Sequence, residues 1–500
     1  MSETLDVLIV GAGLSGIGAA HHLRRRLPHA SFALLEAREA VGGTWDLFRY
    51  PGVRSDSDMY TLGYAFRPWT EAKAIADGPA ILKYVRDTAA EHGIAERIRF
   101  RHAVRRLAWS SADALWTAEV ETPDGPATLR ARFVLSCTGY YDYGGGYTPE
   151  IPGLGDFAGR LVHPQAWPKD LDHTGKRVVV VGSGATAVTL VPAMADTAAH
   201  VTMLQRSPTY VVSRPAQDAM AIALRKRLPA KLAYGAIRWR NVLLGMFFFR
   251  QMRARPARAK ANLIAMARKE LRPGYDVETH FTPRYDPWDQ RLCLVPDSDL
   301  FRALNEDRAS VVTGEIDRVV PEGVRLKSGE VLPADVLVTA TGLKLQALSG
   351  MAISVDGAPV ALGERLNYRG VMIEGCPNLA AVFGYTNASW TLKADLTSEW
   401  VCRLLLHMGR RGLASATPEN HDPEVKPEPF LNFSSGYVQR ALHLFPKQGS
   451  KAPWRLHQNY VLDILTLRHA KLEDGVLRFR RAGEAIDAAP SLPTAMKEAA

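Results

Sequence analysis

The sequence has little cysteine and no long apolar run, and both absences exclude whole classes of protein. Only 4 of its 500 residues are cysteine, and they stand far apart, at Cys137, Cys293, Cys376 and Cys402. This spacing excludes a disulfide framework and the paired Cys/His ligands of a zinc site, so we expect no metal. No run reaches the roughly 18 apolar residues that a transmembrane helix needs.

We also expect no signal peptide, because the first four residues lead directly into a largely apolar strand. The composition, with 47% apolar and 23% charged residues, is that of an ordinary globular enzyme. The length is enough for about two to four domains with a sizeable core. We therefore expect a cytoplasmic protein, and no oligomeric state is predicted.

One stretch almost lacks negative charge. Residues 222–272 hold fourteen Lys and Arg but a single acid, Glu270, so the remainder of this +10 chain is slightly acidic. The stretch is predicted to be helical and contains the apolar patch 242–249. No nucleic-acid module accompanies the charge, and we expect no nucleic-acid partner. Two interpretations stay open: a solvated helical subdomain, or a basic amphipathic surface that contacts anionic lipid on the inner face of the membrane, with Trp239 partly inserted.

A glycine-rich turn follows the first strand, residues 5–10. The turn holds Gly11, Gly13, Ser15 and Gly16, a helix follows, and a second strand ends at Glu36. This is the pattern of a Rossmann unit, in which the glycines allow a tight turn, approach of a pyrophosphate and close helix packing. Glu36 suits a ribose and disfavours a 2′-phosphate. The sequence therefore predicts a site for FAD or NAD here.

A second Rossmann pattern starts at the strand of residues 177–181. Its turn holds Gly182, Ser183, Gly184, Thr186 and Ala187, where alanine replaces the third glycine. The next strand ends without an acid, at Gln205, and is followed by Arg206 and Ser207. A guanidinium can bind a 2′-phosphate through two hydrogen bonds, so this site is predicted to bind NADPH.

Two further segments carry a family resemblance. Residues 157–168 read F-A-G-R-L-V-H-P-Q-A-W-P, with His163 between Gly159 and Trp167, and residues 42–56 read G-G-T-W-D-L-F-R-Y-P-G-V-R-S-D. Both resemble fingerprints of the Baeyer–Villiger monooxygenases, which are flavoproteins. The second segment contributes Gly43, Thr44, Trp45 and Asp56 and assigns FAD to the first site.

The resemblance implies a reaction and its residues. Members of this family use FAD, NADPH and O₂ to convert a ketone to an ester or lactone, with sulfoxidation of sulfides and thioamides as a side activity. Arg291 matches the active-site arginine, which stabilises negative charge on oxygen, and Asp56 would orient it. Arg284 and Asp58 are nearby competitors. Gln290 stands where many members have lysine, which leaves the strictness for NADPH open.

The remaining predictions concern His163, Asn387 and the layout of the chain. His163 is expected to act as a conformational relay on the linker, and the segment around Asn387 is expected to close over the flavin. The fold class is α/β, with two Rossmann-like domains and a helical insertion in the NADPH domain. The predicted divisions are FAD domain 1–143, linker 144–176, NADPH domain 177–213, insertion 214–285, NADPH domain 286–343, and FAD domain with tail 344–500.

Two alternatives to ketone oxygenation remain. One is a flavin monooxygenase restricted to nitrogen or sulfur, although such enzymes lack the Trp167-Pro168 ending. The other is a membrane-associated flavin redox sensor or scaffold that works through the basic segment.

Overall fold

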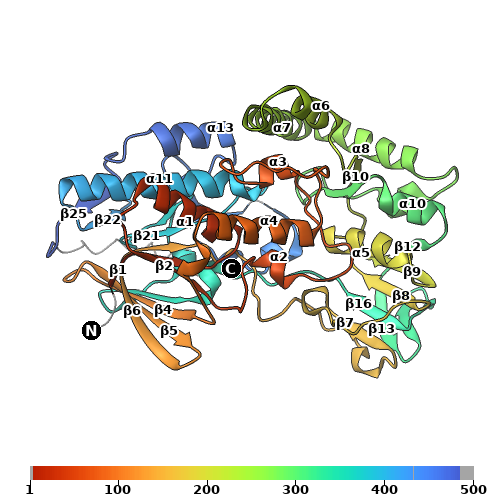
Figure 1. Cartoon of the computed structure of the whole chain (residues 1–500). Helices are drawn as coiled ribbons and strands as arrows, with labels where there is room; N and C mark the ends of the chain where they lie inside the picture. Colours follow the sequence, from red (N-terminus) through yellow and green to blue (C-terminus); the bar gives the residue numbers. More distant parts are fainter. Residues whose placement is uncertain (1–3, 432, 485–500) are drawn as a thin grey trace.

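The protein, described by a computed structural model over residues 4–431 and 433–484, contains two α/β units (Figure 1). The predicted carboxyl-terminal tail lies outside the described residues from 485 onward. The first unit is built on an 11-stranded sheet. Its main path runs β18 (Ala358–Pro359), β17 (Ala352–Val355), β4 (Ala103–Ser110), β5 (Leu115–Thr122), β6 (Gly125–Ser136), β1 (Thr4–Val10), β2 (Phe32–Glu36) and β3 (Ile98–Phe100). A branch from β6 carries β21 (Leu379–Ala381), β20 (Met372–Ile373) and β19 (Asn367–Tyr368).

The parallel part of this sheet is the first Rossmann unit. β1 pairs in parallel with both β2 and β6, as its short, largely apolar run predicts. Helices α1 (Leu14–Arg26), α4 (Gly78–Glu91) and α11 (Trp390–Arg411) form one core with these strands, and the antiparallel strands β4 and β5 pack on the other face. The carboxyl end of the chain thus completes the domain that its amino end begins.

The second unit is a five-stranded parallel sheet. Its order is β12 (Ala309–Thr313), β9 (His200–Gln205), β8 (Arg177–Val181), β16 (Val336–Thr339) and β7 (Arg160–Val162). Helices α5 (Ala185–Ala195) and α10 (Asp299–Asn305) share its core, and the small sheet of β13 (Ile316–Val320), β14 (Gly323–Leu326) and β15 (Val331–Pro333) covers its other face. Because β7 is an edge strand of this sheet, the predicted linker segment is partly built into the second unit.

Two segments cross between the units, and they are hydrogen-bonded to each other. Residues 140–147 leave the first unit and residues 342–346 return to it. The amide of Asp142 donates to the carbonyl of Lys344 at 2.9 Å, and that of Tyr147 to Gly342 at 3.0 Å. The crossing is therefore a paired ribbon rather than two independent linkers.

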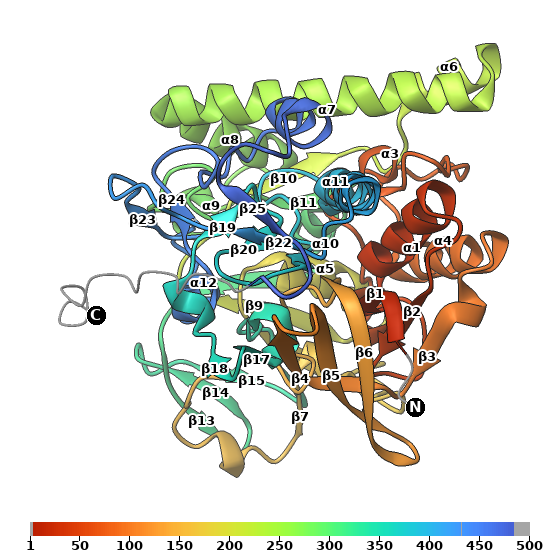
Figure 2. The same ribbon diagram turned by 90° about the vertical axis from the view of Figure 1, so that its left-hand side faces the viewer.

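The basic stretch forms three helices, α6 (Ala219–Arg227), α7 (Ala230–Ala254) and α8 (Pro256–Glu270). The expectation that this insertion belongs to the NADPH domain is only partly met, because its helices pack on different cores. Residues of α6 and α7 join the core of the first unit, whereas Leu271 and the end of α8 join that of the second. Figure 2 shows α7 along the upper edge of the molecule. Local helical propensity does not reveal which unit a helix packs against.

Besides several 3-10 helices, the described chain contains further short elements. They are α2 (Thr44–Leu47), α3 (Met59–Leu62), α9 (Val277–Phe281), α12 (Gly436–Gln439), α13 (Tyr460–Asp463) with the π-helix Ile464–His469, and the strand pairs β10 (Val211–Arg214) with β11 (Cys293–Pro296), β22 (Ser415–Pro418) with β25 (Leu477–Arg480), and β23 (Pro427–Glu428) with β24 (Gln448–Gly449). Across the described ranges, no helix has the length and apolar character to cross a bilayer, and no His, Cys, Asp and Glu side chains cluster as metal ligands would. The four cysteines are buried and unpaired.

Candidate active site between the two dinucleotide-binding units

The first glycine turn leaves no room for side chains. A Cβ on Gly11 would lie 2.7 Å from the carbonyl oxygen of Cys137, and one on Gly16 would lie 2.0 Å from that of Gly11. Helix α1 starts at the N-cap Gly13 without a side-chain cap, so its first N–H groups are free for an anion. Ser15 is already engaged, since its Oγ accepts a hydrogen bond from Nε1 of Trp390 at 2.7 Å.

Glu36 and the segment after Gly42 surround this turn. Oε2 of the buried Glu36 accepts from the amide of Ala12 at 2.8 Å, which fixes the carboxylate beside the turn. A Cβ on Gly43 would lie 3.1 Å from Cα of Gly13, so the two backbones meet. Thr44 is hydrogen-bonded to the hydroxyl of Tyr143 at 3.1 Å. Trp45 packs, partly buried, against the first core.

The second turn repeats the first. A Cβ on Gly182 would lie 2.3 Å from the carbonyl oxygen of Ala340, as one on Gly11 would meet Cys137. Helix α5 also starts without a side-chain cap, at Gly184, and Ala187 is buried where that helix packs on the sheet. Oγ of Ser183 donates to the carbonyl of Ser207 at 3.1 Å. Arg206 is exposed at the end of β9.

These two turns fit two dinucleotides. Each offers uncapped helical N–H groups and a backbone surface that a side chain would fill. The strand after the first turn ends in an acid and the strand after the second is followed by a cation, which matches a ribose hydroxyl and a ribose phosphate respectively.

Arg291 and Asp56 meet between the two units. Nη1 of Arg291 donates to Oδ2 of Asp56 at 3.2 Å, and the two side chains remain 35% and 42% exposed. Desolvation acts to lower the pKa of Arg291, but the neighbouring oxygens of Tyr140 and Asp56 outweigh it and hold that pKa well above its usual value. The guanidinium is therefore a permanent cation, held in one place by a carboxylate.

Asp58 and Arg284, the two competitors for these roles, do not take part in this pair. Asp58 caps α3, accepting from the amide of Thr61 at 3.1 Å, and it also accepts from Nδ2 of Asn241 at 2.9 Å. Arg284 is exposed. The structure thus pairs Arg291 with Asp56 and uses Asp58 to start a helix.

An aromatic cavity lies beside Arg291. Its lining comes from the crossing segment, the residue before β11, the segment that leads into α11 and the carboxyl-terminal part of the chain: Tyr140, Arg291, Phe383, Tyr385, Thr386, Trp390, Leu431, Phe433, Tyr437 and Val438. Nε of Arg291 is buried and, within the described residues, has no hydrogen-bond partner. Burial raises the pKa of Tyr437 to about 12, so this phenol stays neutral. Sequence reasoning missed Tyr437 and Phe433, because no motif marks the segment that holds them.

The segment 42–56 also reaches the second unit. A Cβ on Gly52 would lie 2.7 Å from Cβ of Ala193 on α5, so this turn packs directly against the helix of the second turn. Tyr50 is buried in the second core, and this burial raises the pKa of its hydroxyl although the neighbouring Thr186 side chain acts to lower it. The residues that follow the first turn therefore connect it to the second.

His163 lies at the crossing, away from the arginine. Its Nε2 is 3.3 Å from the carbonyl of Gly342, and its Nδ1 accepts from the amide of Gln165 at 3.2 Å. Burial lowers the pKa of His163. Among the residues described, no hydrogen bond or ion pair joins it to Arg291 or Asp56.

In the side-chain amide of Asn387, the nitrogen is hydrogen-bonded and the oxygen is not. Its Nδ2 donates to the carbonyl of Gln458 at 3.0 Å, whereas its Oδ1 is buried and lacks a partner in the described part of the chain. A second cavity, partly lined by Gln458, shares Phe383 and Tyr385 with the cavity beside Arg291. Asn387 therefore has a buried acceptor free for a bound group.

Known proteins share this sequence and this fold. The model of the flavin-binding monooxygenase-like family matches residues 74–265, and that of the NAD(P)-binding Rossmann-like domain matches residues 9–76. The FAD-containing monooxygenase EthA of Mycobacterium tuberculosis (strain ATCC 25618 / H37Rv) is 52% identical over 482 residues, which cover 96% of this chain and 99% of the relative.

Solved structures agree at the level of the fold. Oxidized steroid monooxygenase bound to NADP superposes with a TM-score of 0.75 at 22% identity, covering 96% of this chain and all of the other. OTEMO in complex with FAD and NADP gives a TM-score of 0.69 at 23% identity, covering 84% and 88% of the two chains. The predicted α/β fold with two Rossmann-like units is confirmed, and the predicted flavoprotein cofactors agree with these relatives. The chain belongs to the family of FAD-containing flavin monooxygenases.

Proposed function

We propose that this protein is a Baeyer–Villiger monooxygenase that binds FAD at the first glycine turn and NADPH at the second. It inserts one atom of O₂ beside the carbonyl of lipophilic ketones to give esters or lactones, and it oxygenates sulfides or thioamides at the same site. The observation that carries this proposal is the pair of Arg291 and Asp56 beside an aromatic cavity, at the junction of the two units.

The division between the cofactors rests on charge. The carboxylate of Glu36 at the first turn suits ribose hydroxyls, and the cation of Arg206 at the second suits a ribose phosphate. FAD bound at the first turn would supply the chemistry that activates O₂. The first turn and Asn387 would hold FAD, and the second turn with Ser207 would hold NADPH.

The side chains provide charge, orientation and exclusion of water. Arg291 places a fixed positive charge where negative charge develops on oxygen during the reaction, and Asp56 keeps the guanidinium from rotating away. The apolar walls, which include Phe383 and Trp390, favour a lipophilic substrate and displace water from the reacting atoms. His163 acts as a positioning residue, because it holds the crossing segments that set one unit against the other.

An isotope experiment tests this function. Purified enzyme would be incubated with NADPH, ¹⁸O₂ and either an aryl ketone or a thioether, and the products analysed by mass spectrometry. We expect an ester that carries one ¹⁸O atom. In Arg291→Ala, ester formation should fall about 10²- to 10³-fold, as for loss of one oxyanion-stabilising donor, while NADPH still reduces the flavin.

The exposed Arg284 offers the matched control. Arg284→Ala should oxygenate the ketone at the wild-type rate. Wild-type ester formation by Arg291→Ala would refute the role of Arg291. Sulfoxide without any ester in the wild-type enzyme would instead favour the restricted nitrogen- or sulfur-oxygenating enzyme, and NADPH consumption without an oxygenated product would favour the redox sensor.

A further inference from the structure

Helix α7 exposes six large apolar side chains, four of them in a row along its outer face. Leu232, Trp239, Leu243, Leu244, Phe247 and Phe248 are between 44% and 64% exposed. Leu232, Trp239, Leu243 and Phe247 recur at intervals of seven and four residues, which places them on one face of the helix. A soluble domain rarely leaves such a row uncovered, so this face is suited to a partner.

The apolar face continues onto the neighbouring element. The ring of Trp239 lies 5.7 Å from that of Tyr460 at the start of α13, and the next turns expose Leu462 and Leu465 at 41% and 54%. Figures 1 and 2 both show α7 and α13 near each other at the same edge of the molecule. We name the six exposed residues of α7 together with Leu462 and Leu465 the apolar edge.

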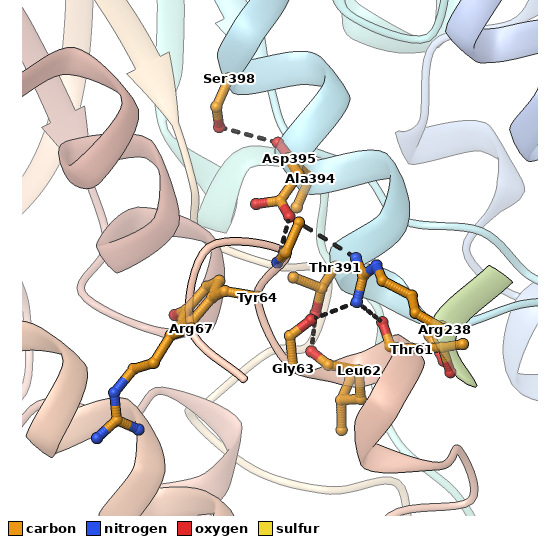
Figure 3. Close-up of polar contacts among 12 residues, drawn as sticks. Thr61, Leu62, Gly63, Tyr64, Arg67, Arg238, Thr391, Ala394, Asp395 and Ser398 are labelled. Atoms are coloured by element: carbon orange, nitrogen blue, oxygen red, sulfur yellow. Dashed lines mark hydrogen bonds and ion pairs between the residues drawn. The ribbon is translucent and has the colours of Figure 1, made fainter. Parts of the chain in front are cut away.

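The opposite side of α7 is fixed to the first unit. The buried Arg238 donates through Nη1 to the carbonyls of Tyr60 and Gly63 at 2.8 and 2.7 Å, and its Nη2 lies 3.8 Å from the buried Asp395 of α11 (Figure 3). Removing such a cation from its carbonyls and carboxylate is costly. The helix therefore cannot roll over to cover its own apolar edge.

Cations surround the apolar edge. Lys226, Arg227, Lys231, Arg250 and Arg258 on α6, α7 and α8, and Arg255 between α7 and α8, are exposed, and none of them forms an ion pair with any described residue. Helix α7 contains no acidic residue. Two copies of this surface would repel each other, whereas an anionic surface would be attracted.

We propose that the apolar edge and its surrounding cations bind peripherally to an anionic phospholipid bilayer. The apolar side chains enter the boundary between headgroups and acyl chains, and the Lys and Arg side chains remain at the level of the phosphates. This is how an interfacial amphipathic helix binds, and it requires no membrane-spanning segment. The proposal is independent of the reaction proposed above, because it concerns a surface outside the cavity beside Arg291.

Vesicle co-sedimentation of the FAD-loaded full chain tests the proposal. Vesicles of phosphatidylcholine with about 30 mol % phosphatidylglycerol should bind the protein, and vesicles of pure phosphatidylcholine should bind it far less. Raising the salt from about 50 mM to about 500 mM should weaken binding, because the Debye length shortens. Equal binding to both vesicles, or none to either, would overturn the proposal.

Two pairs of variants separate the apolar and electrostatic contributions. Leu243→Ser with Phe247→Ser should abolish binding, whereas Leu444→Ser, a Leu with 42% exposure elsewhere, should not change it. Lys231→Glu should lower the partition coefficient by at least roughly five-fold, the equivalent of one cation at the surface, and Lys426→Glu should have no such effect. All four proteins should consume NADPH at the wild-type rate, which shows that they are folded. A change of oligomeric state in the double Ser variant, with unchanged vesicle binding, would identify the edge as a contact between copies instead.

Discussion

Gly146 and His163 are in direct contact, since a Cβ on Gly146 would lie 1.8 Å from Cε1 of the imidazole. Gly146 thus serves close packing within the crossing. Its neighbour Gly145 has open space at the same position. The contact therefore fixes how the first crossing segment lies on the histidine.

The first prediction concerns this contact. Gly146→Ala should displace the His163 ring from Gly342 and shift the crossing segments. Because a misplacement of about 1 Å can cost on the order of 10²-fold in rate, we expect a comparable loss in the rate of flavin reduction by NADPH. Stopped-flow absorbance would measure it. Gly145→Ala is the control, and equal rates for both variants would contradict the assignment.

The second prediction concerns the choice of nicotinamide cofactor. Arg206→Ala should raise KM for NADPH about ten-fold or more, the cost of one charge-assisted hydrogen bond, and should leave KM for NADH nearly unchanged. Steady-state kinetics with both cofactors would measure this. Lys176 precedes β8, at the opposite end of the same sheet. The control variant Lys176→Ala should therefore change neither KM for NADPH nor KM for NADH. A parallel rise for both cofactors would argue against recognition of the 2′-phosphate.

The third prediction concerns the anchor of α7. Arg238→Met should lower the free energy of unfolding by about 3–5 kcal/mol. The variant leaves the carboxylate of Asp395 and the carbonyl groups that accept hydrogen bonds from Arg238 buried without a cation beside them. Arg253→Met removes only an exposed ion pair with Asp289 and should cost about 0–1 kcal/mol. Denaturant titration of both variants tests this, and equal costs would show that the buried network contributes little.

The fourth prediction concerns acid stability. Burial, together with the positive charges of His22 and His92, lowers the pKa of His21 to about 3, whereas the unfolded chain titrates near its usual 6.5. Below about pH 6.5, His21 is therefore protonated in the unfolded chain but not in the folded one. The contribution of His21 to the free energy of unfolding is fully present above about pH 6.5 and is lost progressively as the pH falls toward 3.

His21→Phe should reduce this dependence, because the ring stacks on Phe66 at 3.5 Å and a phenyl group retains that contact without titrating. Thermal unfolding midpoints of the variant should fall less than those of the wild-type protein between about pH 7 and pH 5. Identical pH profiles would rule out His21 as a source of acid sensitivity.

The two glycine turns could be predicted from the sequence because their chemistry is local. A turn in which a Cβ would strike a carbonyl at 2.7 Å must be glycine, and the strand and helix beside it follow from short apolar and helical patterns. The fingerprint of residues 42–56 favours Asp56 and leaves Asp58 as a nearby competitor, and the geometry adds that Asp58 caps α3.

The aromatic side of the site could not be predicted in this way. Tyr437 and Phe433 approach Arg291 through tertiary packing of a segment that follows no periodic pattern. The same holds for α7, which follows the second Rossmann pattern in sequence but packs on the first unit. Sequence spacing gives local geometry, whereas these contacts join residues more than 140 positions apart.

The division of the basic helices between two cores has a mechanical consequence. Besides the paired ribbon at the crossing and the packing of segment 42–56 on α5, the units are also joined where α7 ends and α8 begins, at Arg255, which terminates one helix and precedes the other. Two units that are joined at several separate places can rotate relative to each other less freely than two units joined by a single hinge. Any swing of the second unit must be accommodated at this joint. The distance between the two glycine turns is therefore coupled to the angle between α7 and α8.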